Sequence, residues 1–363
     1  MKKTTIFCMA ALMLLIFGCA PNSGKNKSEK KVLSKNIEYD VSINNYWMIS
    51  QSAFEASNES WYVGNIETSS RKAFQELLFK NALSGKLNLT DLNNKSIDTN
   101  KLKDLISFTD TVTMTRLIPP FNNYDTLIKK MVPESWVTGL RFRENWSYDP
   151  NTMAITKKVI AMAPLVSIVH YDNDGKETIE ESKALFWIIF PEKTKPATVL
   201  TKRIVSDLIF HHTFFSKDIN VDSVAMDAYI QKFMNLVYSD SLKAYACGCG
   251  ASDFSDVPVS GKELKERLCG TDTIAYATPQ HKHGSYDTII KHDVPISMIR
   301  FLEEWTFDPA TMAIDKKVVG ICPVEICYDE IGEVKGNRPI FWVYFSDVWT
   351  PFGGKLELKK AEK

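Results

Sequence analysis

Two segments of the sequence place carboxylates at the same spacing and raise the question of acid–base chemistry. They are ENWSYDPNTMAITKKV (144–159) and EEWTFDPATMAIDKKV (303–318), and eleven of their sixteen positions are identical. In a catalytic interpretation, each segment would supply a carboxylate pair that exchanges protons with a substrate. The pairs would be Glu144 with Asp149 and Glu303 with Asp308.

A structural role explains the same carboxylates. Asp149 and Asp308 each precede a proline, and Asp-Pro is typical of a turn. Glu144 would then pair with Arg141 or with a neighbouring lysine. The residues shared by the two segments are mostly aromatic, aliphatic or turn-forming, and none of the six histidines recurs in both copies of the pattern. We therefore favour the structural interpretation and expect no catalytic residue.

A group of thiols and imidazoles is the second candidate for chemistry. It comprises Cys247 and Cys249 in CGCG, Cys269, and His281 and His283 in HKH. Such side chains suit zinc, but recognised zinc motifs place two or more residues between their cysteines. We therefore favour loop cysteines and exposed histidines, or a disulfide that uses Cys269. We expect no metal and no cofactor.

The cysteine count limits what disulfides can do. Of the seven cysteines, five remain if Cys8 is removed with a signal peptide and Cys19 is lipidated. Because five is odd, at least one thiol stays unpaired or pairs outside the chain. Cys322 and Cys327 lie on either side of Pro323 within a predicted strand region and could be buried or cross-linked. The sequence shows no Gly-rich phosphate loop, nucleophile elbow or zinc-protease motif.

The two segments belong to a longer internal repeat. Downstream, VIAMAPL pairs with VVGICPV, and LFWIIFPE (185–192) pairs with IFWVYFSD (340–347). Upstream, YDTLIKKMVP (124–133) pairs with YDTIIKHDVP (286–295), and QELLFKNALSGK (75–86) matches SDLIFHHTFFSK (206–217) more weakly. The length of the repeat predicts two tandem copies of one domain, at about 70–195 and 203–350.

Each copy is expected to combine helices with antiparallel strands. The stretch RKAFQELLFKNALSG has apolar residues along one helical face, and Gly85 marks its end. Residues 142–148 alternate as in a strand, and the long strand after the Asp-Pro turn contains Pro164, which must break it or lie at an edge. A short apolar strand near 185–190 completes a meander. The predicted fold class is α+β, with two tandem copies of a helix-plus-antiparallel-meander domain.

Aromatic and acidic residues common to both copies form a structural signature. Indoles bury large areas when the N–H has a partner, so the tryptophans are expected to be core anchors. The signature consists of Glu144, Trp146, Tyr148, Asp149 and Trp187 in the first copy, and of Glu303, Trp305, Phe307, Asp308 and Trp342 in the second.

The N-terminal sequence predicts export and lipidation. MKKTTIFCMAALMLLIFGC has a basic start, a short apolar run and small residues before a cysteine, which is typical of a secretory signal. We expect cleavage after Gly18 and lipidation of Cys19, as in a bacterial lipobox; the alternative is an ordinary signal peptide. The expected divisions are a signal peptide at 1–18, a flexible tether at 19–38, an N-terminal segment at 39–69 and a C-terminal tail at 351–363.

The charge balance argues against nucleic acid as a partner. The chain has 44 basic and 44 acidic residues, and loss of Lys2 and Lys3 with the signal leaves 42 basic against 44 acidic residues, a net charge of −2. A nearly neutral chain without a basic block has no electrostatic footprint for a phosphate backbone. Beyond the signal, the sequence offers no run of roughly 20 apolar residues for a membrane span. We expect a protein that is exported and tethered to a membrane by lipid.

The repeated core carries a family resemblance. The box E-x-W-x-aromatic-D, with its downstream Phe-Trp strand, is similar to the core of the GldN/PorN family of the type IX secretion and gliding-motility machinery. The resemblance covers most of residues 70–350. It implies a non-catalytic periplasmic scaffold that associates with a partner lipoprotein in an outer-membrane-linked assembly. Because the core occurs twice and Cys19 follows a lipobox, we expect a divergent, lipidated, tandem-duplicated member.

Three functional classes follow. We favour a scaffold that binds other proteins of an outer-membrane-associated assembly, anchored by lipid in the outer membrane and facing the periplasm. The alternative is a lipid-anchored protein that binds a peptide or a glycan, which exposed tryptophans in a concave patch would support. A hydrolase or metal protein would use Cys247, Cys249, His281 and His283, and stoichiometric zinc in the purified protein would support it.

Overall fold

The structure is a computed structural model, and two consecutive sets of elements in it follow the same order. It describes residues 29–43, 66–171, 177–194, 196–209, 221–247, 255–269, 271–276, 286–291, 296–328, 334–346, 348–349 and 355–356. Unit 1 comprises β1 (Lys31–Ser42), α3 (Thr68–Leu83), β2 (Leu89–Thr90), α4 (Thr99–Leu105), β3 (Ser107–Thr115), β4 (Asn123–Met131), η2 (Glu134–Trp136), β5 (Val137–Tyr148), β6 (Ile155–Tyr171), β7 (Glu177–Ala184) and β8 (Trp187–Ile189). Unit 2 comprises β9 (Thr198–Ile209), α5 (Ser223–Tyr238), β10 (Ala244–Ala246), β11 (Pro258–Val259), α6 (Gly261–Leu268), β12 (Thr271–Tyr276), β13 (Tyr286–Lys291), β14 (Ile296–Phe307), β15 (Ile314–Tyr328), β16 (Val334–Pro339) and β17 (Phe341–Tyr344). The short strands β18 (Val348–Trp349) and β19 (Lys355–Leu356) pair after unit 2.

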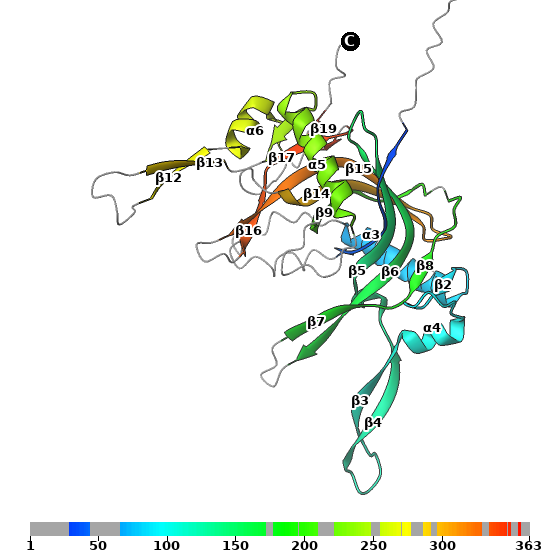
Figure 1. The fold of residues 1–363 in the computed structure, drawn as a ribbon. Helices are drawn as coiled ribbons and strands as arrows, with labels where there is room; N and C mark the ends of the chain where they lie inside the picture. The colour runs from blue at the N-terminus through cyan, green and yellow to red at the C-terminus, as the bar shows by residue number, and fades with distance from the viewer. Residues whose placement is uncertain are drawn as a thin grey trace, which may run out of the picture.

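Each unit is built on an antiparallel meander. The meander is β1–β5–β6 in unit 1 and β9–β14–β15 in unit 2. Along its edge opposite β5, β6 pairs with β7 and β8. In the same way, β15 pairs with β16 and β17 along its edge opposite β14. The strands β6 and β15 meet where Lys157 pairs with Lys316, so that both meanders belong to one 13-stranded sheet (Figure 1). The predicted class, α+β with a tandem duplication, is confirmed.

Strand β1 corrects the expectation of a flexible tether that reaches residue 38. Lys31–Ser42 pairs antiparallel with β5, and Leu33 and Ile37 are buried. The alternation of a strand is hard to recognise here because the register shifts around Ser34 and Asn36 adopts a φ of 54°. A lysine-rich edge strand with bulges therefore has the composition of a tether.

The weak upstream match between 75–86 and 206–217 is also wrong. Residues 75–83 belong to α3, whereas 206–209 belong to β9 and 210–217 lie outside the described residues. In the structure β9 corresponds to β1, and α5 corresponds to α3. Apolar runs as short as LLF and LIF fit a helix or a strand equally well, so the sequence pattern did not distinguish them.

A bidentate ion pair joins the first two strands of the meander in each unit. Arg141 donates to both carboxylate oxygens of Asp40, at 2.7 and 2.9 Å, and Arg300 donates to those of Asp207, at 2.7 and 2.8 Å. The equal placement supports the correspondence of β1 with β9. It also shows that Arg141 is not the partner of Glu144, contrary to that part of the prediction.

The two Asp-Pro turns have the same conformation. Asp149 Oδ1 and Asp308 Oδ1 each accept a hydrogen bond from the backbone N–H two residues on, at 2.8 and 2.9 Å. Four residues after each aspartate, a buried methionine has a positive φ, 59° in one turn and 57° in the other. A helix of the opposite unit binds each turn. These contacts are Lys232 Nζ to Pro150 O and Asn81 Nδ2 to Pro309 O, both at 2.7 Å.

Pro164 lies inside a continuous strand, so the expectation that it would break the strand or lie at an edge is wrong. On one side of β6, β8 pairs as far as Met162 and β7 pairs from Leu165, so Pro164 falls where the partner strand changes. Its carbonyl accepts from the N–H of Leu185 at 3.0 Å. The missing N–H therefore interrupts neither ladder. Pro323 takes the equivalent place between β16 and β17.

The first long helix of each unit packs against the other unit. The ring of Phe74 in α3 meets that of Phe307 in β14 edge-on at 5.3 Å, and Tyr229 in α5 meets Tyr148 in β5 edge-on at 5.0 Å. As a result, one continuous hydrophobic cluster contains side chains of both units. Among the described helices, none is long and apolar enough to cross a bilayer.

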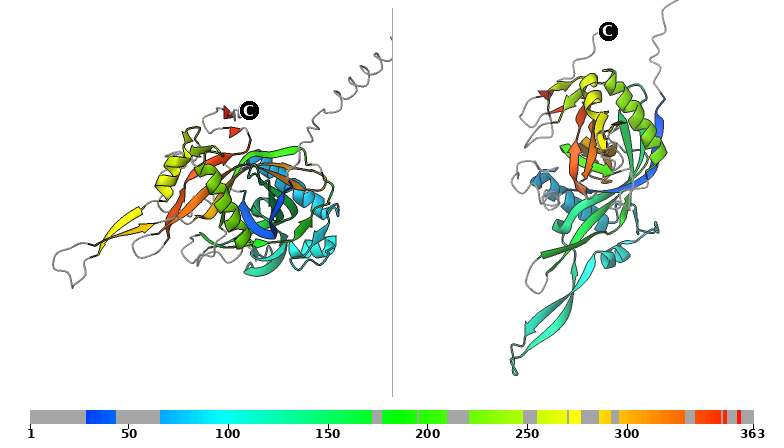
Figure 2. Two further views of the ribbon diagram at one scale, coloured as in Figure 1. Left: turned by 45° about the horizontal axis from the view of Figure 1, so that its top comes forward. Right: turned by 60° about the vertical axis from the view of Figure 1, so that its left-hand side comes forward.

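Two ribbons project from this body. The hairpin β3–β4 of unit 1, which we call arm 1, extends away from the sheet, and the hairpin β12–β13 of unit 2, arm 2, extends in another direction (Figures 1 and 2). The repeated sequence YDT-x-IK forms the returning strand in both arms. The duplication therefore includes the arms as well as the body.

Candidate functional site

The repeated glutamates and two repeated lysines form a buried cluster between the units. Lys316 Nζ of unit 2 lies 2.7 Å from Glu144 Oε1 of unit 1, and Lys157 Nζ of unit 1 lies 2.5 Å from Glu303 Oε1 of unit 2. All four side chains have 0% exposed surface. Each glutamate thus pairs with the lysine of the other copy, so the ion pairs are crossed.

The second oxygen of each glutamate accepts a hydrogen bond from an indole. Trp146 Nε1 donates to Glu144 Oε2 at 2.6 Å, and Trp305 Nε1 donates to Glu303 Oε2 at 2.7 Å. Glutamate and tryptophan lie two residues apart on a strand, so their side chains share a face. This spacing is the physical basis of the E-x-W element in the repeated box.

Aromatic rings enclose the two ammonium groups in the same reciprocal way. Lys157 Nζ lies 3.4 Å from the ring centroid of Phe301, and Lys316 Nζ lies 3.1 Å from that of Phe142. The indoles of Trp146 and Trp305 lie at 4.4 and 4.5 Å from Lys157 and Lys316. Cation–π attraction of this kind is strongest where water is excluded. The rings therefore replace part of the hydration that the ammonium groups lose.

Tyr39 makes the cluster asymmetric. Its hydroxyl donates to Glu144 Oε2 at 2.9 Å and accepts from Lys316 Nζ at 3.2 Å and from Lys157 Nζ at 3.4 Å. The corresponding position on β9 is Ser206, because Tyr39 pairs with Phe142 and Ser206 with its counterpart Phe301. One phenol from β1 thus contacts ionic groups of both units.

The electrostatics of the cluster follow from burial and from the opposite charges. Burial favours a higher pKa for Glu303, but Lys157 and Lys316 outweigh it and hold the pKa below its usual value. Burial lowers the pKa of Lys316 to about 8 even though both glutamates favour its charged form. Burial, together with the same glutamates, raises the pKa of Tyr39 well above its ordinary value, so the phenol keeps its proton. Tyr39 therefore bridges Glu144 and the two lysines as a neutral phenol.

The carboxylates of the catalytic interpretation, which we did not favour, do not come together as acid–base pairs. Glu144 and Glu303 are enclosed in the core, whereas Asp149 and Asp308 organise the turns. A buried cluster with no exposed atom on its charged groups cannot receive a substrate. The four signature tryptophans are buried as well, with 0–2% exposure. Tyr148 and Phe307 contact the exchanged helices.

Sequence analysis did not predict that Lys157, Lys316 and Tyr39 belong to the buried cluster. Lys157 follows Ile155 by two residues on β6, so the alternation placed it on the inward face. An inward lysine repeated at the same offset as an inward glutamate was the available signal for a buried ion pair. No such signal existed for Tyr39, because β1 was not recognised as a strand.

Of the candidate zinc residues, the structure describes Cys247 and Cys269, and each lies beside a residue outside the candidate group. Cys249, His281 and His283 lie outside the described residues. Cys269 lies at the end of α6 with its thiol 3.7 Å from the hydroxyl of Tyr238. Cys247 lies beside Cys322 instead, with 3.7 Å between the sulfurs. Within the described part of the chain, no group of three or more His, Cys, Asp or Glu residues could hold a metal ion.

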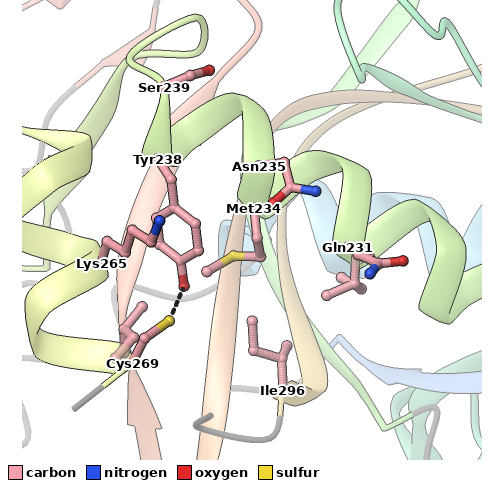
Figure 3. Close-up of a pocket in the computed structure, with 10 residues that line it drawn as sticks. Gln231, Met234, Asn235, Tyr238, Ser239, Lys265, Cys269 and Ile296 are labelled. Atoms are coloured by element: carbon pink, nitrogen blue, oxygen red, sulfur yellow. Dashed lines mark hydrogen bonds between the residues drawn. The ribbon is translucent and has the colours of Figure 1, made fainter. Parts of the chain in front are cut away.

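A pocket lies between α5 and α6, close to the start of β14. It has a volume of about 550 Å³. Met234 and Tyr238 from α5, Lys265 from α6, Cys269 and Ile296 line it together with neighbouring residues (Figure 3). Figure 3 shows the Tyr238 hydroxyl directed at the Cys269 thiol. None of the signature residues lines this pocket.

The tip of arm 1 exposes three large apolar side chains. Leu117, Ile118 and Phe121 are 89%, 71% and 71% exposed. Polar cross-strand bonds hold the strands below the tip; Thr113 Oγ1 to Asp125 Oδ1 measures 2.6 Å. The tip itself has no hydrophobic core of its own. Clustered apolar groups exposed in this way are typical of interaction sites.

The fold and the buried signature define a duplicated α+β protein whose repeated residues are core and turn residues. The family model described as "Gliding motility associated protein GldN" matches residues 52–232 and 226–352. These matches cover most of the chain and meet within α5, which opens the helical part of unit 2. The chain therefore belongs to the GldN family, which is associated with gliding motility and type IX secretion. No curated protein matches the chain.

The crossed ion pairs predict strong coupling between Glu144 and Lys316. Glu144→Leu or Lys316→Met alone leaves a buried charge without its partner and is expected to lower the free energy of unfolding by about 3–5 kcal/mol. The double variant removes both charges and is expected to lose less than the sum. Urea unfolding of the four proteins gives the coupling energy. A matched control is Glu304→Leu with Lys317→Met, a partly exposed pair at 2.8 Å, for which we expect at most about 1 kcal/mol. Additive losses for the buried pair would contradict the prediction.

The lowered pKa of Glu303 predicts a loss of stability in acid. Because the pKa is lower in the folded than in the unfolded state, Glu303 stabilises the fold above its unfolded pKa of about 4.3. This contribution disappears as the pH falls through the folded pKa. We expect the free energy of unfolding to fall less between pH 6 and pH 3 in Glu303→Gln than in the wild type. Chemical denaturation at several pH values tests this, with Glu304→Gln as the surface control. Equal losses in wild type and Glu303→Gln would be inconsistent with the ionic role.

Proposed function

We propose that this chain is a non-catalytic scaffold that binds other proteins of an envelope assembly for gliding motility or type IX secretion. The observation that carries the proposal is the contrast between the signature and the tip of arm 1. The repeated charged and aromatic residues are enclosed between the units, whereas Leu117, Ile118 and Phe121 are exposed at the end of a projecting ribbon. A two-stranded ribbon gains little stability by itself, so its apolar tip is best explained by contact with a partner. Membership of the GldN family supports a multi-protein setting.

We further propose that the chain is a lipoprotein of the outer membrane that faces the periplasm. The support is the lipobox-like sequence that ends at Cys19, and three acyl chains would exceed the two hydrophobic signals that stable anchoring needs. The polar residues between Cys19 and β1 would separate the body from the membrane. A partner lipoprotein, as the family resemblance implies, would then lie at the same membrane.

Binding of a peptide or glycan through exposed tryptophans gains no support from the described residues. Trp146, Trp187, Trp305 and Trp342 are buried. Trp136 is 39% exposed and lies near Phe108 at the base of arm 1, with 5.1 Å between ring centroids. The tryptophans whose burial the structure describes therefore do not form an exposed stacking surface for a sugar.

The scaffold proposal predicts that the arm 1 tip carries partner binding. The triple variant Leu117→Ser, Ile118→Ser and Phe121→Ser removes apolar area from the tip without touching the body. We expect it to unfold at the same urea concentration as the wild type and to recover at least tenfold less partner in a crosslinking pull-down from envelope membranes. Loss of two or three buried apolar anchors accounts for a change of this size, since each is worth about 1.5–3 kcal/mol.

A matched control changes exposed apolar residues elsewhere on the body. Val199, Val224 and Val257 are 52%, 78% and 57% exposed. Their simultaneous change to serine should leave the pull-down unaltered. Retention of the same partners by the arm variant, or equal loss in both triple variants, would show that arm 1 is not the binding element.

The lipoprotein proposal predicts release of a Cys19→Ala variant from membranes. Without the acylated cysteine, the chain keeps no hydrophobic anchor of the proposed kind. After cell fractionation, the wild type is expected in the outer-membrane fraction and the variant in the soluble periplasmic fraction. Cys8→Ala serves as the control, because that residue would be removed with the signal. A variant that stays membrane-bound would overturn the assignment of Cys19.

A further inference from the structure

Two cysteines of unit 2 lie in contact on one face of the sheet. Cys247 follows β10 directly, and Cys322 lies in β15. Both strands pair with β17, β10 along one side and β15 along the other. The sulfurs are 3.7 Å apart. Their separation of 75 residues along the chain makes this a contact created by the fold.

We propose that Cys247 and Cys322 form a disulfide when the folded protein meets a disulfide oxidant. A disulfide requires sulfurs about 2 Å apart, so the thiols must approach by roughly 1.7 Å from their present contact. Rotation of the two side chains about their Cα–Cβ bonds would supply a movement of this size. The inference rests on the fold and does not depend on the proposed function.

The exposure of the two thiols sets the order of the reaction. Cys247 is partly exposed, whereas Cys322 is buried and donates to the carbonyl of Pro323 at 3.3 Å. Burial raises the pKa of the Cys322 thiol well above its usual value, so it is a thiol in the resting protein. An external oxidant therefore reacts first at Cys247, the accessible sulfur.

The exchange balances with a small-molecule disulfide such as oxidised glutathione. The thiolate of Cys247 attacks one sulfur of the reagent, which forms a mixed disulfide and releases one glutathione thiolate. Cys322 then loses its proton and attacks the Cys247 sulfur, which releases the second glutathione. The two protein thiols are oxidised by two electrons, and one glutathione disulfide is reduced to two thiols. Export to an oxidising compartment would supply an oxidant of the same class in the cell.

Unit 1 shows that this pair is a feature of unit 2 alone. At the constant offset of the repeat, Cys322 corresponds to Ala163, which is buried at the equivalent place in β6. Residues 20–246 contain no cysteine. The cross-link would therefore join β10 to β15 and close a chain segment that contains α6, arm 2 and β14. Closing a long segment stabilises a fold mainly by restricting the unfolded chain.

Oxidation of the purified protein by oxidised glutathione tests the inference. The test protein carries Cys249→Ser, Cys269→Ser and Cys327→Ser, so that Cys247 and Cys322 are the cysteines left beyond the N-terminal region. We expect the loss of two titratable thiols, a peptide that joins Cys247 to Cys322 in non-reducing mass spectrometry, and a higher urea midpoint that a reductant reverses. Wild-type protein should give the same peptide.

The control is Cys322→Ala, which installs the residue of unit 1 and is therefore expected to fold. In this variant Cys247 should stop at the mixed disulfide with glutathione, detected as a mass increase of one glutathione. The inference is overturned if the native test protein also stops at the mixed disulfide, or if the linked peptide forms only in urea. A wild-type protein that joins Cys247 to another cysteine instead would equally overturn it.

Discussion

The burial of four charged side chains is the constraint on which the two-unit architecture depends. An ion that leaves water without a partner costs several kcal/mol, even after the protein relaxes. Within unit 1, Lys157 lies opposite Trp146 in the strand register, and its carboxylate partner Glu303 comes from unit 2. The reverse holds for Lys316. Separation of the units would break both ion pairs at once, so the relative position of the two meanders is determined by the same residues that define the repeat.

The exchanged helices extend this reciprocity beyond the charges. Phe74 packs on a strand of unit 2 and Tyr229 packs on a strand of unit 1, so neither unit completes its core alone. The architecture is that of an intertwined dimer whose two halves share one chain. The two copies differ at Tyr39, whose hydroxyl contacts both lysines, because its counterpart on β9 is Ser206. A duplicated chain can vary one copy at such a position, whereas identical subunits cannot.

Features of the fold that depend on local sequence could be predicted, whereas contacts between the two units could not. The long hairpins could be predicted because alternation and Asp-Pro turns are local signals, and the duplication was visible in the identical residues of both copies. The crossed pairing of Glu144 with Lys316 was not predictable from one copy, because a partner in another unit leaves no local pattern. Strand β1 was missed since its bulges and lysines hide the alternation, and Pro164 was misjudged because the change of partner strand at that point is a tertiary feature.

The sequences that connect the two strands of each arm differ between the units, unlike the repeated residues of the body. The body keeps the same glutamates, lysines, tryptophans and Asp-Pro turns in both copies, because the crossed ion pairs and the helix–turn contacts are reciprocal. No such requirement applies beyond the paired strands of the arms. The sequence between β3 and β4 is RLIPPFN, whereas the sequence between β12 and β13 is ATPQHKHGS, which is polar and contains two histidines. A homodimer of a single unit would present two identical tips. Duplication within one chain allows the two arms to carry connecting sequences of different chemistry on one body, which identical subunits could not do.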